Sequence, residues 1–289
     1  ITHSQDMVLG IYFLTDFFNP KYPDYNTEEE WKEKILPVAR FSSCEDAIHA
    51  FNNKQVTLKD KIVVLEDNQP IQTTIGRVIF NSILPEDYPY DNNPQTKKQI
   101  NKVLADMFSH YGAETTVAVA DKIKALSFYF VTKSGLSIGK EDYTVYESGK
   151  VAEIIAEGDA KTTLIQEQYD QGLLTEQERY NLIINNWHDA IDKVDSEIAD
   201  RVKNEGADSP VGLMAISGSR GNATNIRLAS GLTGIMVDAT NREIELPIRS
   251  NYTHGMSSLE AFVATRGARQ GLISTALKTA DSGYLTRRL

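Results

Sequence analysis

The sequence predicts a mixed α+β protein that is mostly helical, and three features of the chain lead to this prediction. Residues 150–204 carry apolar side chains at helical spacing, residues 252–289 contain no proline, and residues 56–75 hold two runs of β-branched side chains. The first two patterns are typical of long helices and the third of a small strand pairing. A chain of 289 residues can bury a core as one large domain or as two to three small ones.

Composition narrows the classes of protein that the chain can belong to. The single cysteine, Cys44, excludes an internal disulfide framework and fits a reducing compartment. No apolar run approaches the ~18 residues of a transmembrane helix. The chain starts at Ile1 without the pattern of a signal peptide, and a start without Met suggests a piece of a longer chain.

The charge of the chain is unevenly distributed. The net charge of −10 disfavours a protein that binds nucleic acid over its whole surface. Residues 1–209 carry a net charge of −14, whereas residues 210–289 carry +4. If the protein contacts phosphate, the last 80 residues are where we expect the contact.

The first 140 residues predict short elements separated by loops. Asn, Pro and Gly mark the breaks, and β-branched or helically spaced apolar residues mark the elements. In order, we expect a buried strand or short helix over residues 7–14, a helix over 27–39 capped by Thr27 with Glu30, a hairpin of strands 56–65 and 71–75, a loop over 84–94, and helices 95–111 and 115–130 joined around Gly112.

Residues 150–204 give the clearest helical pattern. In their second half, apolar residues recur at spacings of three and four from Tyr180 to Val202, close to a coiled-coil seam. Gly172 suits the left-handed position after a helix end, and Thr175 with Glu178 forms a capping-box pattern for the next helix. We therefore expect an antiparallel helical hairpin with a tight tip. Its acidic surface is either a solvated face or a protruding docking arm.

Residues 252–289 predict one helix of 38 residues, about 57 Å long at about 1.5 Å per residue. Small side chains form a stripe along its end: Thr275, Ala276, Thr279, Ala280 and Gly283. Such a stripe lets a bulky partner approach the backbone, and the partner is either another helix or a flat ligand such as a base pair. Charge for phosphates and an aromatic ring surround it, supplied by Lys278, Tyr284, Arg287 and Arg288.

Two further groups of residues invite a chemical interpretation. Arg220 lies between two glycines in a polar turn, where backbone amides and a guanidinium can face an anion, although glycine-rich turns are common. Asp189, Asp192 and Asp195 recur on the outer face of the seam helix, where a solvated face is favoured over a metal site. No HExxH, GxSxG or GxxxxGK[ST] motif is present, so the residues alone show no self-contained catalytic apparatus.

Several stretches, in one order along the chain, resemble a known family. The run from Ala276 to Leu289 (ALKTADSGYLTRRL) resembles the bridge helix of the largest catalytic subunit of multisubunit RNA polymerase, which is β′ in bacteria. The run from Ser217 to Asn222 resembles the adjoining F-loop, and the run from Gln5 to Gly10 resembles the segment just after the active-site barrel. The segment from Ile165 to Asn181 resembles the rim helices of the funnel around the secondary channel.

The resemblance implies a fold and a role for each segment. It implies a small mixed α/β pore domain over residues 1–145, a funnel domain with the rim-helix hairpin over 146–210, an F-loop region over 211–249 and the bridge helix over 250–289. Arg220 falls on the arginine that reaches the phosphates of the incoming nucleotide. The template base and template DNA are implied to lie beside Thr275, Ala276, Lys278, Thr279, Ala280, Tyr284, Arg287 and Arg288. Factor docking at the rim tip is implied for Gly172, Leu173, Thr175 and Glu178.

The resemblance also implies partners and a metal. The aspartates that hold the catalytic Mg²⁺ in the family lie upstream of Ile1 and the trigger loop lies downstream of Leu289, so the chain alone is expected to be inactive. The implied enzyme is a nucleotidyltransferase of the bacterial cytoplasm and nucleoid, with no membrane contact. Its implied partners are the other polymerase subunits (β, α and the remainder of β′), template DNA and the RNA–DNA hybrid, nucleoside triphosphates and secondary-channel transcription factors.

The sequence departs from the family at a few positions. The family usually has Arg-Glu at Thr253-His254 and Met-Arg at Leu232-Thr233, and a polar or small residue at Ile216. A rival hypothesis from another class is a non-catalytic scaffold or regulator derived from the polymerase. The mass of the native gene product separates the two hypotheses. The polymerase subunit is expected to be well above about 100 kDa, which is far more than a single domain of roughly 100–200 residues.

Overall fold

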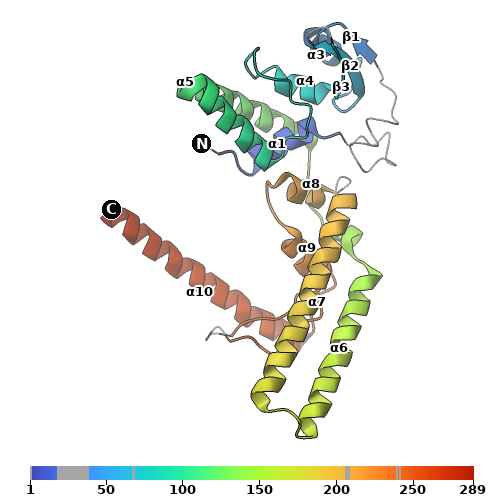
Figure 1. Ribbon diagram of the computed structural model, residues 1–289, viewed down its shortest axis with the longest axis vertical. Helices are drawn as coiled ribbons and strands as arrows, with labels where there is room; N and C mark the ends of the chain where they lie inside the picture. Colours follow the sequence, from blue (N-terminus) through green and yellow to red (C-terminus); the bar gives the residue numbers. More distant parts are fainter. Residues whose placement is uncertain (1, 18–38, 67–68, 206–208, 239, 241) are drawn as a thin grey trace. The chain divides into compact units, whose positions relative to one another are not determined.

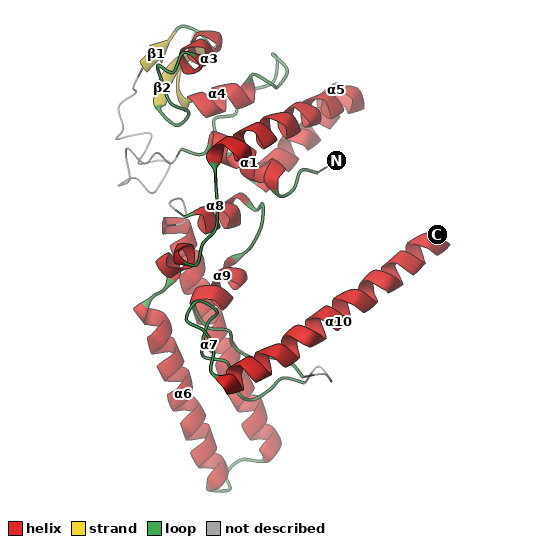
Figure 2. Cartoon of the chain, turned by 180° about the vertical axis from the view of Figure 1, so that it is seen from behind, coloured by secondary structure: helices red, strands yellow, loops and turns green. Residues whose placement is uncertain are grey.

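A computed structural model describes the chain except for residues 1, 18–38, 67–68, 206–208, 239 and 241. The described residues form two compact units, Ile1–Asp142 with Arg201–Asn222 and Tyr143–Asp200 with Ala223–Leu289. Helices dominate both units, and the strands belong to the first (Figures 1 and 2). This confirms the mostly helical α+β class. The helix expected over residues 27–39 lies outside the described residues, apart from its last position.

The first unit is built around the packing of helix α1 (Asp6–Thr15) on helix α5 (Lys97–Ser134). The apolar segment 7–14 is thus a helix, and its Val8, Ile11 and Leu14 are fully buried. Gly10 is required at the crossing, because a Cβ there would collide with the backbone carbonyl of Ser127. The two helices therefore touch backbone to backbone.

Helix α5 is two helices joined at Gly112, as the sequence predicts. Gly112 has φ 76° and ψ −179°, a conformation outside the helical region that glycine adopts readily. Apolar residues of both halves enter one core with α1, among them Val103 and Met107 before the break and Ile123 after it. The break thus folds the helix back so that both halves cover α1.

A small mixed sheet lies beside this helical core. Strand β1 (Ala39–Phe41) runs parallel to β2 (Lys61–Glu66), which pairs antiparallel with β3 (Gln69–Thr74). The predicted hairpin is confirmed, although its first strand starts at Lys61 rather than at residue 56. Helices α3 (Cys44–Asn52) and α4 (Ile75–Asn81) bury apolar residues with the sheet.

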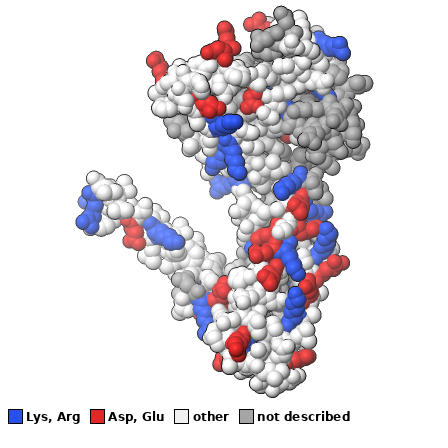
Figure 3. Space-filling view, viewed as in Figure 1, with Lys and Arg blue, Asp and Glu red and all other residues white. Residues whose placement is uncertain are grey.

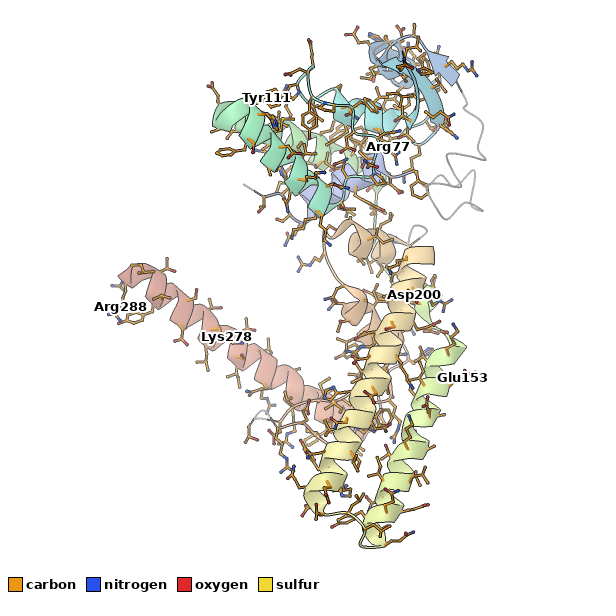
Figure 4. The ribbon with its side chains drawn as sticks, in the orientation of Figure 1. Arg77, Tyr111, Glu153, Asp200, Lys278 and Arg288 are labelled. Carbon is orange, nitrogen blue, oxygen red and sulfur yellow. The ribbon has the colours of Figure 1, made fainter. Side chains whose placement is uncertain are left out.

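The loop over residues 84–94 is held in place by side chains of α4. Arg77 is fully buried and donates to the backbone carbonyls of Thr15 (Nε, 2.9 Å) and Asn92 (Nη1, 2.6 Å). Asn81 donates to the carbonyl of Asp91 (2.9 Å) and accepts from its amide (2.8 Å). Figure 4 labels Arg77 among the elements that it joins. The loop is therefore a fixed part of the first unit.

The second unit contains the predicted helical hairpin, α6 (Gly149–Asp170) beside α7 (Glu176–Glu205), preceded by a short 3-10 turn (Glu141–Tyr146). Trp187 of α7 is fully buried, and a Cβ at Gly158 of α6 would lie only 3.2 Å from its ring. The glycine that weakens the helical pattern of α6 thus makes room for the tryptophan of α7. Further along the seam, Val194 and Ile198 are fully buried.

One member of the aspartate trio, Asp195, is less solvated than predicted, with 30% of its side chain exposed. Asp195 accepts a hydrogen bond from the Nε of Arg227 at 2.8 Å, and this arginine, in helix α9 (Ala223–Ser230), is 7% exposed. Arg227 also donates to the carbonyls of Leu232 (2.6 Å) and Thr233 (2.9 Å). The outward position of Asp195 on α7 was wrong because a short helix packs over it.

The C-terminal helix is shorter than predicted. Helix α10 runs over Ser258–Arg288, 31 residues, so it begins six residues after Tyr252. Gly255 has φ +87°, which ends regular backbone before the helix, and Ser257 caps its N-terminus with Glu260. Absence of proline permitted the longer helix, but the cap and the glycine determine where the real one begins.

Candidate nucleic-acid interface

The second half of α10 has no cover within its own unit. Every residue from Thr275 to Leu289 is exposed, whereas Val263 near the start of the helix is buried. In Figures 1 and 2 this half extends away from the hairpin and α9. The small-residue stripe is thus open, and no helix of this unit packs on it.

The stripe offers mostly carbon surface. The hydroxyl of Thr275 donates to the carbonyl of Gly271 (2.9 Å), and that of Thr279 donates to the carbonyl of Thr275 (2.8 Å). Because both hydroxyls are satisfied within the helix, a partner at Ala276 and Ala280 meets methyl groups and backbone. Such a surface suits close packing rather than hydrogen-bond recognition.

Cationic side chains lie around this half of the helix, with Arg287 on the side of the stripe and Lys278 and Arg288 on other sides. Lys278, Arg287 and Arg288 are exposed, and the guanidinium of Arg288 lies 5.5 Å from the centre of the Tyr284 ring. Figure 3 shows basic groups at the middle and at the free end of the helix, and Figure 4 labels Lys278 and Arg288. Within residues 275–289 the only acidic side chain is Asp281, so this end of the helix is positive.

Exposed leucines on the opposite side of α10 were missed by the sequence interpretation. Leu277 is 62% exposed and Leu285 is 60% exposed. They lie about 80° apart around the helix, at about 100° per residue, on the side away from Thr275 and Thr279. The sequence signal for them was the spacing of eight residues, which places both leucines on one side of the helix. The same side also carries Lys278, Asp281 and Arg288, so it combines large apolar side chains with charged groups.

A single carboxylate fixes the start of α10. Glu260 accepts from the amide and hydroxyl of Ser257 (3.0 and 2.8 Å) and from those of Ser250 (3.2 and 2.8 Å). It also accepts from the amide of Arg249 (3.1 Å). Burial alone would raise the pKa of this carboxyl, but the hydrogen bonds from Ser257 and Ser250 lower it to about 2. The Ser-x-x-Glu spacing was a signal for this cap that the sequence interpretation did not use.

Two further contacts join the segment before α10 to the hairpin. The guanidinium of Arg249 donates to Oδ1 of Asp159 at 2.8 and 2.6 Å, and it lies 5.7 Å from the centre of the Trp187 ring. His254 lies 2.9 Å from the carboxylate of Glu147. The start of α10 is therefore tied to both helices of the hairpin.

The turn around Arg220 is formed differently from the expected anion cradle. Gly218 (φ +72°) and Gly221 (φ +82°) do adopt the left-handed conformation. However, the amides of residues 218–220 donate internally, to the Ala215 carbonyl, the Ser217 hydroxyl and the Met214 carbonyl. The expectation that backbone amides face an anion was therefore wrong for these three.

The guanidinium of Arg220 remains available. The side chain is exposed at the end of helix α8 (Pro210–Ser217), and among the described residues no acidic side chain pairs with it. Arg220 belongs to the first unit and α10 to the second. The predicted residues of α10 lie together on one helix. The predicted residues of the hairpin tip lie together in one turn, as a separate group.

The hairpin tip is capped as predicted. Gly172 has φ +77°, and its amide and that of Leu173 donate back to the last turn of α6. The amide of Thr175 donates to the Glu178 carboxylate (2.9 Å), and the amide of Glu178 donates to the Thr175 hydroxyl (3.3 Å). Hydrogen bonds from Thr175 lower the pKa of Glu178. Leu173 is 69% exposed at the apex of this ordered turn.

The described residues give no indication of a metal centre or a membrane span. No group of three or more His, Cys, Asp or Glu side chains is placed among them to hold a metal ion. None of the described helices combines the length and the apolar character needed to cross a bilayer.

Comparisons with known proteins assign the chain to a family. Models described as RNA polymerase Rpb1 match it in three places: domain 3 over residues 1–143, domain 4 over 174–260 and domain 5 over 255–289. The chain belongs to the RNA polymerase Rpb1 family. This confirms the resemblance to the largest polymerase subunit, which the sequence motifs suggest.

Individual relatives agree with this assignment. The chain is 41% identical over 290 residues to "DNA-directed RNA polymerase subunit beta'" of Desulforamulus reducens, covering 99% of this chain and 23% of that protein. It is 41% identical over 296 residues to the protein of the same name from Aquifex aeolicus (99% and 18%) and 40% identical over 294 residues to that from Moorella thermoacetica (100% and 24%). The chain spans at most about a quarter of the length of these relatives.

The pKa of Glu260 gives a testable prediction for the start of α10. Because the pKa is lowered to about 2 from 4.5, the carboxylate stabilises the folded segment above pH 4.5, and this stabilisation is lost as the pH falls from 4.5 toward 2. Carbon-13 NMR of the glutamate carboxyls is expected to show one titration with a midpoint near 2. That resonance should vanish in Glu260→Gln and persist in Glu153→Gln, which changes an exposed residue of α6 (Figure 4). A midpoint near 4.5 would contradict the assigned hydrogen bonds.

Proposed function

We propose that the chain forms part of a DNA-directed RNA polymerase and helps to position template and nucleotide during RNA synthesis. The observation that carries the proposal is the uncovered second half of α10, which presents small residues on one side and cations along its length. Membership of the Rpb1 family supports it. In this proposal the nucleotidyltransferase is the whole assembly, working in transcription in the cytoplasm and nucleoid, and the four segments predicted from the sequence are its pore, funnel, F-loop and bridge-helix parts.

The stripe on α10 is proposed to seat the template base that pairs with the incoming nucleotide. A base pair is flat and wide, so it needs a surface without projecting side chains, which Thr275, Ala276, Thr279 and Ala280 provide. Lys278, Arg287 and Arg288 are proposed to neutralise backbone phosphates of template DNA and the RNA–DNA hybrid, with Tyr284 as a stacking surface. Leu277 and Leu285 are proposed to pack on other polymerase subunits or on the remainder of β′.

The described residues contribute positions and charge rather than metal chemistry. Mg²⁺ would supply charge stabilisation to nucleotidyl transfer, but no metal-holding group of side chains occurs in the described part of the chain. We propose, from the resemblance to the polymerase subunit, that the residues that hold Mg²⁺ lie outside this chain. The isolated 289-residue chain is proposed to be unable to extend RNA, and template-directed incorporation by it would contradict this.

The stripe is tested by a bulky substitution. In the whole enzyme, Ala280→Trp is expected to slow nucleotide addition by about 5- to 150-fold, because overpacking a close contact typically costs about 1–3 kcal/mol. Promoter binding should stay near normal. The measurement is single-nucleotide addition on a preassembled template scaffold.

A matched variant controls for the added bulk. Ala268 is also exposed on α10 and lies on the same side as Thr275, but about three turns before Ala280, so it controls for position along the helix. Ala268→Trp should leave the rate closer to that of the wild type. Equal rates for wild type and Ala280→Trp would mean that the stripe packs against protein only.

Arg220 is proposed to contact the phosphates of the incoming nucleoside triphosphate. Charge-assisted hydrogen bonds contribute about 1.5–3 kcal/mol, so Arg220→Ala is expected to raise the apparent KM for nucleotides roughly 10- to 100-fold. Arg220→Lys keeps the charge and should fall in between. A change in maximal rate without a change in KM would argue against a contact to substrate phosphate.

The tip of the α6–α7 hairpin is proposed as the docking site for factors that enter the secondary channel, with Gly172, Thr175 and Glu178 holding Leu173 in place. Burial of a leucine contributes about 1.5–3 kcal/mol, so Leu173→Ser should weaken factor binding to the whole enzyme about tenfold or more while basal elongation is unchanged. Leu164→Ser is the control, because Leu164 is 57% exposed on α6 away from the tip. Equal binding by both variants would exclude docking at the tip.

A further inference from the structure

The first unit contains a cavity of about 520 Å³ that the proposed function does not use. One wall is the loop over residues 87–93 and the other is the first half of α5. The lining residues that matter for its chemistry are Asp87, Tyr88, Asp91, Gln99, Lys102, Asp106 and Tyr111. Its volume is in the range of small-molecule sites, about 300–1,000 Å³.

The cavity is preformed, because the loop wall is fixed from behind. The backbone of Asp91 exchanges two hydrogen bonds with the Asn81 side chain (2.8 and 2.9 Å). Asn92 is held by the guanidinium of Arg77 (2.6 Å) and by the hydroxyl of Thr73 (2.8 Å), which also lies 3.0 Å from the hydroxyl of Tyr90. A ligand would therefore meet a rigid wall.

The carboxylates that line the cavity differ in what they already bind. Asp91 is satisfied by the amide and side chain of Asn93 (3.0 and 2.9 Å) and by the side chain of Gln95 (2.8 Å). Asp87 accepts the hydroxyl of Tyr111 across the cavity. Asp106 is half-buried, and among the described residues no cation pairs with its carboxylate. Asp106 therefore retains its full capacity to accept hydrogen bonds.

The electrostatic field in the cavity is negative. Burial raises the pKa of Tyr88, and the charges of Asp106 and Asp91 raise it further. Burial and the bond to Asp87 likewise raise the pKa of Tyr111. Three carboxylates line the cavity together with one lysine, Lys102, and one histidine, His110, so the acidic groups are in excess and an anion is disfavoured. A cavity of this size also exceeds what a bare metal ion needs, and no metal-holding group occurs among the described residues.

We propose that this cavity binds an organic cation, an ammonium or guanidinium group that pairs with Asp106 between the rings of Tyr88 and Tyr111. A carboxylate supplies the charged acceptor and tyrosine faces attract the cation, the combination that proteins use to recognise amines. The cation is carried either by a free aliphatic amine or by a lysine or arginine side chain of a neighbouring polypeptide. This inference does not depend on the role proposed for α10. Figure 4 labels Tyr111 on α5.

Titration calorimetry on the full 289-residue chain tests the proposal with three probes. Spermidine represents the free amine, the blocked tripeptides acetyl-Gly-Lys-Gly-amide and acetyl-Gly-Arg-Gly-amide represent a side chain, and inorganic phosphate tests the sign of the charge. Saturable 1:1 binding of spermidine or of a tripeptide supports the proposal, and the probe that binds identifies the source of the cation. Failure of every cationic probe to bind, or binding of phosphate at the same site, would overturn it.

Variants separate the cavity from general charge attraction. Asp106→Asn should weaken binding at least tenfold, and Lys102→Met should strengthen it, because Lys102 is an exposed competing cation. Glu114→Gln makes the same charge change as Asp106→Asn at an exposed position on α5 outside the cavity and should have no effect. Equal weakening by Glu114→Gln and Asp106→Asn would mean that general surface charge, and not the cavity, accounts for the binding. If Asp106→Asn fails to fold, Gln99→Phe, which fills the cavity and keeps all its carboxylates, must abolish binding.

Discussion

The carboxylate of Glu260 joins the first turn of α10 to two earlier segments of the second unit, residues 249–250 and the cap at Ser257. It accepts hydrogen bonds from residue 249, from residue 250 and from the cap of α10 at residue 257. A helix whose second half touches nothing in its own unit can have a defined direction only if its first turn is fixed. Since all the donors point at one ionised group, the direction of α10 depends on that group staying charged.

Buried arginines tie the loops of both units in a similar way. Arg77 donates to carbonyls of α1 and of the loop before α5, and Arg227 donates to the backbone after α9 and to Asp195. Each guanidinium satisfies acceptors on segments distant in sequence, which apolar contacts could not hold in register. Removing such a side chain leaves buried carbonyls without a donor. Its loss therefore destabilises the fold by more than the hydrogen bonds themselves contribute. Rigid loops follow, and these loops frame the α5 cavity and lead toward α10.

The sequence predicts the elements with strong local signals and misses those that tertiary contacts decide. Helical spacing, Gly172 and the Thr175–Glu178 pair were enough to predict the α6–α7 hairpin and its tip, because these signals act within a few residues. The predicted start of α10 was wrong because absence of proline only permits a helix, while Gly255 and the Ser257 cap determine where it begins. Asp195 and the amides before Gly221 were misjudged because their partners lie elsewhere in the fold or compete within the turn. The cavity was invisible, since its two walls become neighbours only after Arg77 and Asn81 fix the loop.

Within its own unit, helix α10 is fixed at one end, so a small rotation there moves its free end by a larger distance. From Val263, the last buried residue, to Arg288 the helix extends about 38 Å at about 1.5 Å per residue. A rotation of about 5° at the anchored end therefore displaces the free end by about 3 Å, close to the ~3.4 Å spacing of nucleotides along one strand. A small rotation at Ser250 and Ser257 is thus amplified, at Arg287 and Arg288, into a displacement of about 3 Å.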